Sequence, residues 1–320
     1  MKILITGATG FIGGRLVKRL LTENHDLFCL VRETSKVDFL KQPGVSLVMG
    51  DITDGGAVDR IFQEVKPEAV FHLAAKVLTD NEKELYAANV DGTRNICQAC
   101  YNHEVSRLVY TSSVSVISGN LDVPLTEGLP YKASDSYGRS KIAAERIAVD
   151  FRGKGLPVAI VRPCMVYGEG EPHLLGKILK KANAWCLPVL NVQGMDSKLH
   201  LVYIENVIDV LAVVLEKNEA LEGTFMVADK EVLTLRKFIE ILYDKLNGTK
   251  PPVVPRWLAK TLLLIPSFKV KADRVFKDRV YDITRAVAVL GYVPKVSTEE
   301  GLTKTVKWWK EKLTCNQVSF

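Results

Sequence analysis

The stretch that decides the fold is ITGATGFIGGRLVKRLL, residues 5–21, where an apolar run ends in closely spaced glycines and a helical pattern follows. Gly7, Gly10 and Gly13 stand in the turn and at the mouth of the helix. Glycine allows a positive φ and lets another backbone or a ligand approach closely. We therefore predict a strand over residues 2–6, a tight turn, and a helix whose N-terminus faces outward.

The first half of the chain repeats this strand-then-helix rhythm. Near-continuous apolar runs alternate with helical stretches, which is typical of a parallel sheet covered on both faces. After the first strand, the predicted strands fall at residues 27–31, 46–50, 69–74, 107–113 and 158–163. The sequence thus predicts an α/β fold with a Rossmann-type, doubly wound parallel sheet.

The glycine spacing indicates a dinucleotide-binding turn. It reads GxxGxxG, a variant of the GxGxxG pattern. A glycine turn between a strand and a helix lets the backbone approach a pyrophosphate, which is held at the helix N-terminus. The candidate cofactor-binding residues of this turn are Gly7, Thr9, Gly10, Phe11, Ile12 and Gly13.

The end of the second strand should distinguish NAD from NADP. An acidic residue there would bind the ribose 2′-OH and favour NAD. This chain instead has Val31 and then Arg32, with Lys36 shortly after. A guanidinium can pair with a 2′-phosphate. We therefore expect NADP or NAD as the cofactor, with NADP slightly favoured, and the alternative is that Arg32 is a solvated loop residue.

Two later strand ends supply further candidate contacts. Asp51, followed by Ile52, ends the third strand, where a carboxylate can accept a hydrogen bond from the adenine amino group. Leu73, Ala74 and Ala75 end the fourth strand and are small enough for a dinucleotide backbone to pass close by. Both stretches are predicted to face the cofactor.

The chain is expected to divide into two parts, because the strand–helix rhythm loosens after the sixth strand. Residues 1–163 are predicted to form the NAD(P)-binding Rossmann domain, with residues 199–217 returning to it. Residues 164–198 and 218–320 are predicted to form a smaller C-terminal substrate-binding cap. Apolar helices in the cap suit an apolar substrate, although such helices are more often ordinary core.

Composition argues against several classes of function. The 320 residues carry a net charge of +6 with scattered basic residues, which disfavours nucleic-acid binding. No apolar run reaches the roughly 18 residues of a transmembrane helix. A strand begins at Lys2, which leaves no room for a leader, and six cysteines suit a reduced compartment, so we expect a cytoplasmic protein. One CxxC, Cys97 to Cys100, has no second pair, and no metal is expected.

The motifs TGATGFIG, GDITD, HLAA, NVDGTRN, YTSS, YGRSK and VRPCMVYG follow one another at fitting distances. With them, the chain resembles the extended short-chain dehydrogenase/reductases, the NAD(P)-dependent epimerase/dehydratase superfamily, over essentially its whole length. Its pattern is nearest to the 3β-hydroxysteroid dehydrogenase, dihydroflavonol reductase and hopanoid-associated epimerase branches. The resemblance implies an enzyme with a nicotinamide cofactor and a small-molecule substrate, and it implies a homodimer.

The stretch YGRSKIAAERI, residues 137–147, matches the YxxxK motif of that family, which implies Tyr137 as acid/base and Lys141 as its partner. Four apart on a helix, the two are neighbours. A nearby ammonium and the positive nicotinamide ring both favour the phenolate, so we expect the pKa of Tyr137 to fall toward the working range. The resemblance also implies a hydroxyl from the fifth strand, Ser113 or else Ser112, of which at most one should face the cleft.

The resemblance also places Thr111, Pro163 and Val166 at the cofactor, together with Tyr137 and Lys141, whose ammonium can hold the nicotinamide ribose hydroxyls. The reaction itself stays open between two readings. Nucleotide-sugar members often carry an asparagine where this chain has Met165, and a thioether cannot replace that donor. We therefore expect an oxidoreductase that transfers a hydride between nicotinamide and a secondary alcohol or ketone by a Tyr-Lys-Ser mechanism.

The alternative is a nucleotide-sugar epimerase of the UDP-hexose 4-epimerase type, with tightly bound NAD. A diphosphate would need cationic partners, which Lys177, Lys180 and Lys181 could supply. A third reading, a cofactor-sensing protein without activity, is disfavoured by the intact pair of Tyr137 and Lys141.

Overall fold

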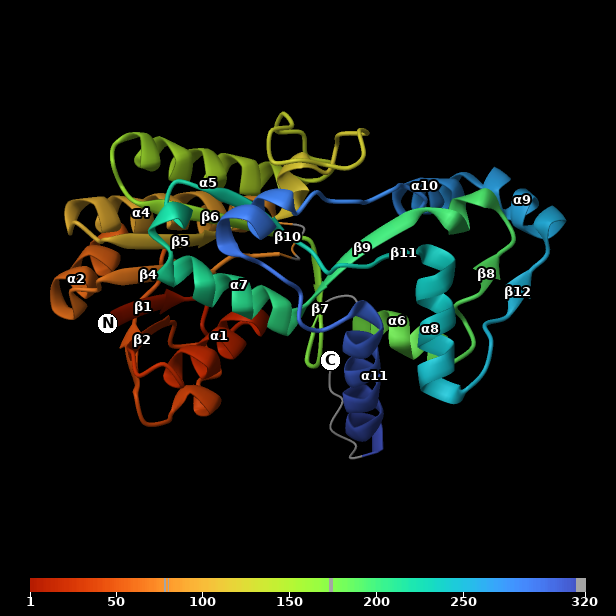
Figure 1. The fold of residues 1–320 in the computed structure, drawn as a ribbon, viewed down its shortest axis with the longest axis horizontal. Helices are drawn as coiled ribbons and strands as arrows, with labels where there is room; N and C mark the ends of the chain where they lie inside the picture. Colours follow the sequence, from red (N-terminus) through yellow and green to blue (C-terminus); the bar gives the residue numbers. More distant parts are fainter. Residues whose placement is uncertain (78, 80, 173–174, 315–320) are drawn as a thin grey trace.

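A computed structural model describes residues 1–77, 79, 81–172 and 175–314 of the chain. Its centre is a seven-stranded sheet of order β10-β6-β5-β4-β1-β2-β3, in which every neighbouring pair is parallel (Figure 1). The strands are β1 (Lys2–Thr6), β2 (Asp26–Val31), β3 (Val45–Met49), β4 (Ala69–His72), β5 (Arg107–Thr111), β6 (Val158–Pro163) and β10 (Thr224–Val227). The predicted doubly wound fold is confirmed.

Helices cover both faces of this sheet. The side chains of β1 alternate between two buried clusters, one on each face of the sheet. Ile3 and Ile5 belong to the cluster that includes residues of α1 and α7. Leu4 belongs to the cluster that includes residues of α2, α4 and α5. Both faces of each strand are therefore apolar, as a parallel sheet requires. The helices are α1 (Phe11–Leu21), α2 (Gly55–Val65), α3 (Glu82–Tyr86), α4 (Gly92–Asn102), α5 (Ser136–Gly153) and α7 (Ile204–Glu216).

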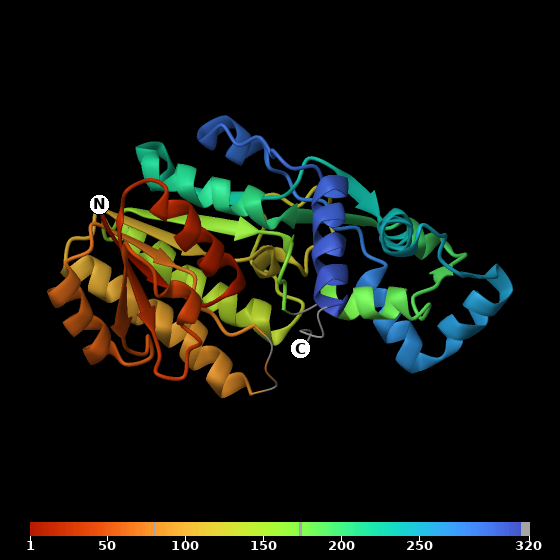
Figure 2. The same cartoon turned by 90° about the horizontal axis from the view of Figure 1, so that it is seen from below.

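The smaller part of the molecule extends from one end of the sheet (Figures 1 and 2). It holds a three-stranded sheet of order β11-β9-β7 and a two-stranded sheet of β12 and β8. Its strands are β7 (Met165–Tyr167), β8 (Val189–Leu190), β9 (Lys198–Tyr203), β11 (Val232–Thr234) and β12 (Val253–Val254). Its helices are α6 (Leu175–Asn183), α8 (Leu235–Asn247), α9 (Arg256–Leu264), α10 (Pro266–Val275) and α11 (Thr298–Thr314).

Two strands lie differently from the predicted domain boundaries. Residues 218–320 were expected in the cap, but β10 pairs in parallel with β6 at the edge of the large sheet. Residues 199–217 were expected to return to the Rossmann domain; α7 does so, by packing on α1, whereas β9 pairs with β7 and β11. Pairing partners far away in the chain decide both placements, and the division into domains stays a prediction.

No helix in the described part of the chain has the length and apolar character needed to cross a bilayer.

Candidate active site

The glycine turn is wedged between β1 and the end of β4. Gly7 has a φ of +74°, and a Cβ on it would lie 2.6 Å from the Ala74 nitrogen. A Cβ on Gly13 would lie 2.1 Å from the Gly7 carbonyl oxygen. Only glycine fits at either position. No side chain caps the N-terminus of α1 at Gly10, so the first-turn N–H groups have no side-chain acceptor there.

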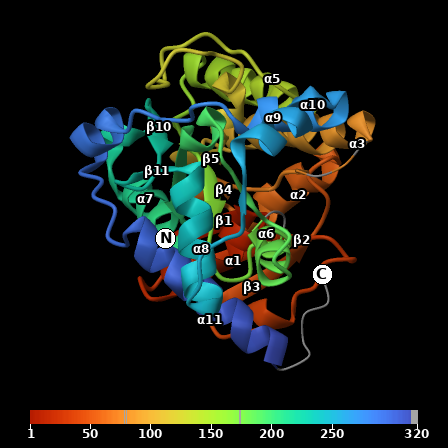
Figure 3. The ribbon, with the colours of Figure 1, turned by 90° about the vertical axis from the view of Figure 1, so that its right-hand side faces the viewer.

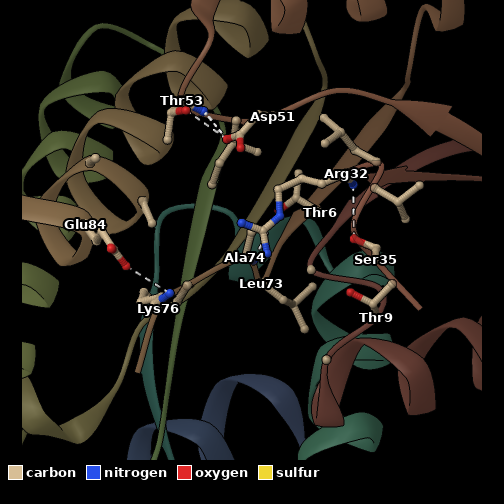
Figure 4. Close-up of a pocket in the computed structure, with 18 residues that line it drawn as sticks. Thr6, Thr9, Arg32, Ser35, Asp51, Thr53, Leu73, Ala74, Lys76 and Glu84 are labelled. Carbon is tan, nitrogen blue, oxygen red and sulfur yellow. Dashed lines mark hydrogen bonds and ion pairs between the residues drawn. The ribbon is translucent and has the colours of Figure 1, made fainter. Parts of the chain in front are cut away.

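Beside this turn lies a pocket of about 430 Å³ at the carboxyl ends of the strands (Figure 4). Its lining includes nine of the predicted cofactor residues: Gly7, Thr9, Gly10, Arg32, Asp51, Ile52, Leu73, Ala74 and Ala75. The other eight predicted cofactor residues do not line it: Phe11, Ile12, Gly13, Thr111, Tyr137, Lys141, Pro163 and Val166. Glycine backbone, small side chains and an anion-accepting helix end together fit a dinucleotide.

Charged and hydroxyl groups ring this pocket. The Arg32 guanidinium extends over its centre in Figure 4, and the Arg32 backbone N–H donates to the Ser35 hydroxyl at 3.1 Å. Asp51 Oδ1 accepts from the Thr53 backbone N–H and hydroxyl, both at 2.9 Å. Sequence reasoning missed Ser35 and Thr53, although both stand within three residues of a predicted contact.

A further lining pair that the sequence did not reveal lies on the α3 side. Lys76 Nζ is 3.2 Å from Glu84 Oε2 in an ion pair between the β4 loop and α3. The Lys76 backbone N–H donates to Asn89 Oδ1 at 2.7 Å, and Asn89 Nδ2 donates to the Ser140 hydroxyl at 2.9 Å. Asn89 thus ties the loop after β4 to α5, the helix of Tyr137.

Tyr137 and Ser113 are brought together by the start of α5. Asp135 caps this helix by accepting from the Gly138 N–H at 2.7 Å, which places Tyr137 in its first turn. The Tyr137 phenol makes a side-chain hydrogen bond with Ser113. Ser113 Oγ also accepts from the Ser115 N–H at 3.2 Å, which holds its rotamer.

Ser112 faces a different environment. Its hydroxyl donates to the carboxylate of Glu145, which is fully buried. The same carboxylate is paired with the guanidinium of Arg162, and Tyr131 donates to it at 2.9 Å. A buried charge is tolerated when it is paired and hydrogen-bonded. This cluster holds α5 against β5 and β6. Because the Ser112 hydroxyl is bonded to Glu145, it is not directed at Tyr137.

Lys141 is almost completely buried, with an exposed fraction of 2%. Its Nζ donates to the Thr111 carbonyl at 2.8 Å and lies 4.5 Å from the centroid of the Tyr110 ring. Burial lowers the pKa of Lys141 to about 7, against a smaller raising effect of the Glu145 charge. Lys141, the predicted neighbour of Tyr137, is thus held by a hydrogen bond to the end of β5.

The pKa of Tyr137 differs from the expectation. Burial raises it to about 12, which exceeds the lowering effect of the Ser113 hydrogen bond. The expected fall is not found in the protein without its dinucleotide, because desolvation disfavours the phenolate and the nearby charge of Asp135 adds to the rise in pKa. These side chains alone keep Tyr137 protonated near neutral pH.

A second cavity, of about 280 Å³, lies against β7 in the smaller part of the molecule. It is lined mostly by apolar side chains: Met165, Val166, Leu175, Ile178, Leu199, Leu201, Leu235, Phe238 and Val275. Three cations, Lys198, Lys277 and Arg279, also line it. The predicted cations Lys177, Lys180 and Lys181 on α6 do not. Val166, predicted at the cofactor, lines this second cavity.

The chain matches the model of the NAD dependent epimerase/dehydratase family over residues 3–228. It is 27% identical over 337 residues to the sterol-4-alpha-carboxylate 3-dehydrogenase (decarboxylating) of Schizosaccharomyces pombe, covering 96% of both chains. It is also 27% identical to a 3 beta-hydroxysteroid dehydrogenase/Delta 5→4-isomerase of Mycobacterium tuberculosis, covering 96% of this chain and 90% of that protein.

Among solved structures, UDP-glucose 4-epimerase from Thermotoga maritima, determined with UDP-glucose, superposes with a TM-score of 0.79 at 24% identity, covering 98% of this chain and all of that one. WbmG of Bordetella bronchiseptica, determined with NAD, has a TM-score of 0.79 at 23% identity, covering 97% and 94%. These two likenesses establish the shared fold.

The dehydrogenase names among the relatives agree with the expected oxidoreductase. A match that spans the glycine turn, all seven strands of the large sheet and Tyr137 settles the family. The chain is an enzyme of the NAD dependent epimerase/dehydratase family, within the extended short-chain dehydrogenase/reductases.

Proposed function

We propose that this enzyme is an NAD(P)-dependent dehydrogenase or reductase for a secondary alcohol or ketone carried on an apolar body. The observation that carries the proposal is the second cavity, which is lined by Met165 and Val166 of β7 and by seven further apolar side chains. A sugar would leave its hydroxyls without partners against such a surface. The hydroxysteroid dehydrogenases among the relatives support this substrate class.

In this proposal Tyr137 moves the proton of the substrate oxygen. Its raised pKa keeps the phenol protonated, which suits donation to a carbonyl oxygen during reduction. Ser113, hydrogen-bonded to Tyr137, would hold the same oxygen and stabilise its developing charge. Lys141 positions the end of β5 through Thr111 and favours the phenolate when protonated. A nicotinamide bound alongside would supply or accept the hydride.

The pocket at the carboxyl ends of the strands is proposed to hold the dinucleotide. The glycine turn and the first turn of α1 would hold the pyrophosphate, and Asp51 the adenine. Arg32 reaches over the pocket where a 2′-phosphate would lie, and no acidic residue ends β2. NADP is therefore slightly favoured over NAD.

One observation favours the second candidate, a nucleotide-sugar epimerase. Lys198, Lys277 and Arg279 line the apolar cavity and could pair with a diphosphate. An epimerase returns the hydride to its own substrate, so its dinucleotide is regenerated in each cycle and can stay bound. A dehydrogenase must exchange its dinucleotide at every turnover.

Dialysis of the purified enzyme tests this distinction. We expect the dinucleotide to be released and turnover to depend on added NADP or NAD. Full activity after exhaustive dialysis, with dinucleotide recovered from the denatured protein, would favour the epimerase.

We further propose a cytoplasmic homodimer. The outer surfaces of α4 and α5 expose Tyr101 and Val149, and an apolar contact between two such helix pairs would cover them. Sedimentation of wild type and of Tyr101→Ser with Val149→Ser tests the dimer, which the double variant should weaken.

A further inference from the structure

The end of the cap farthest from β2 is a helical hairpin, α9 and α10, joined at Ile265 (Figure 1). Figures 2 and 3 place it at the extremity of the molecule, with α9 outermost. Its inner side is anchored: Ala259 and Ala272 are buried, and a Cβ at Gly194 would lie 2.3 Å from the Phe276 ring. The hairpin is therefore held in place by the cap.

The outer side of the hairpin is apolar, which is unusual for an exposed surface. Trp257 is 71% exposed and Leu264 is 79% exposed. Seven residues apart, they lie on one face of α9. Ile265 at the corner is exposed as well, and so is Val253 in the strand before α9. Large apolar side chains gathered at the tip of a protein mark an interaction surface.

The segment that contains the hairpin is strongly positive. Residues 250–277 carry seven basic residues and one acidic residue, a net charge of +6, which equals the net charge of the whole chain. The remaining residues therefore balance to zero. Arg256, Lys260, Lys269 and Lys277 are exposed beside the apolar face. The partner of this surface should thus combine an apolar interior with negative charge.

We propose that the α9–α10 hairpin docks the enzyme on the surface of an anionic lipid bilayer. Trp257, Leu264 and Ile265 would enter the boundary between headgroups and acyl chains, and the flanking cations would pair with anionic headgroups. Tryptophan is suited to this boundary, and interfacial helices combine such residues with Lys and Arg. The docking is peripheral, since α9 has 9 residues and α10 has 10.

The position of the apolar cavity agrees with this docking. Val275, the last residue of α10, lines the cavity, and Lys277 follows at its edge. The hairpin therefore continues directly into the wall of the site proposed for the substrate. Docking would bring that site to a bilayer, where apolar alcohols and ketones partition.

Flotation of the full-length enzyme with vesicles tests the proposal. Vesicles of phosphatidylcholine mixed with phosphatidylglycerol should capture the enzyme at low salt, and pure phosphatidylcholine should capture far less. Trp257→Ser with Leu264→Ser, and separately Lys260→Glu with Lys269→Glu, should each lower the affinity for anionic vesicles at least about tenfold. High salt should also release the wild type.

Matched controls change the same residue types elsewhere. Val287→Ser with Val293→Ser removes two exposed apolar side chains, and Lys230→Glu with Lys307→Glu reverses two exposed charges. Both should bind anionic vesicles as the wild type does. All replaced side chains are exposed, and an unchanged melting temperature confirms folding.

Absence of binding to anionic vesicles overturns the proposal, and so does equal binding by the hairpin variants. A dimer that Trp257→Ser with Leu264→Ser dissociates in the absence of lipid would assign the surface to a second copy instead. The readout is binding, so its outcome is independent of the proposed reaction. Turnover of a water-dispersed substrate by the Trp257→Ser, Leu264→Ser variant should match the wild type.

Discussion

The two cavities of this enzyme differ in how the chain builds them. The proposed cofactor pocket is lined at the carboxyl ends of parallel strands, by a glycine turn and the short loops after β2, β3 and β4. The apolar cavity is lined by five separate stretches between residues 165 and 279, drawn from β7, α6, β9, α8 and α10. General rules of sheet topology place the first pocket. No such rule places the second.

In the proposed function, the two cavities separate cofactor recognition from substrate recognition. A change at Arg32 should act on the dinucleotide alone, and a change at Met165 should act on the substrate alone. Tyr137 lines neither cavity, and its proposed place is between the dinucleotide and the substrate. Variants of these residues test whether dinucleotide binding and substrate binding can be changed independently.

The largest effect is expected for Tyr137→Phe. Loss of the phenolic proton should reduce kcat at least about 10²-fold, the usual scale of general acid–base catalysis. The Kd for the dinucleotide should stay near that of the wild type, as measured by fluorescence titration. Retained turnover in this variant would remove Tyr137 from the mechanism.

Two neighbouring serines supply a matched control for Tyr137. Ser113→Ala removes the hydroxyl bonded to Tyr137 and should lower kcat. Ser112→Ala instead leaves the buried Glu145 short of a donor and should lower stability by about 1–3 kcal/mol with little effect on kcat. The reverse pattern would assign the catalytic hydroxyl to Ser112.

The pH profile should depend on the direction of the reaction. Oxidation needs Tyr137 deprotonated, and its pKa is raised to about 12 by burial. The oxidation rate should therefore rise with pH across the neutral range, by up to about tenfold per pH unit. Reduction needs the protonated phenol and should not rise over that range. Initial rates in both directions check this, and a rate of oxidation that falls with pH would contradict it.

Arg32→Ala should change cofactor choice without changing the substrate KM. If the guanidinium pairs with the 2′-phosphate, its loss should weaken NADP binding by about 1.5–3 kcal/mol and leave NAD almost unaffected. Titration of both dinucleotides against both proteins measures this. Tighter binding of NAD than NADP by the wild type would overturn the assignment.

The smallest effect is expected for Met165→Asn, a change on the substrate side. Met165 is 43% exposed at the cavity, so the fold should tolerate the change. Loss of apolar contact should raise the KM for an apolar alcohol by a few-fold, on the order of 1 kcal/mol. The Kd for the dinucleotide should stay the same. An altered dinucleotide Kd would mean that the two cavities are not separate.

The positions of the first six strands and the glycine turn could be predicted because both depend on local patterns. Short apolar runs mark buried strands, and Gly7 and Gly13 stand where no Cβ fits. The sequence could not reveal the placement of β10 in the large sheet, because its partner β6 lies about sixty residues earlier.

Long-range contacts also explain what was missed at the candidate site. Ser112 and Ser113 are adjacent in the sequence. Their surroundings differ because Glu145 of α5 accepts a hydrogen bond from Ser112. The pKa of Tyr137 was expected to fall because of the Lys141 ammonium and of the positive nicotinamide ring of a bound cofactor. Burial, which depends on the whole fold, has the larger effect.

The central claim is that hydride passes, with net change of the dinucleotide, between the dinucleotide and an apolar secondary alcohol or ketone. One measurement tests it most directly: dialysed enzyme is incubated in parallel with NADP or NAD plus a 3-hydroxysteroid, and with a UDP-hexose without added cofactor. We predict net formation of reduced dinucleotide and a ketone in the first mixture, and unchanged sugar in the second. Interconversion of two UDP-hexoses, with no net reduction of dinucleotide in the first mixture, would contradict the claim.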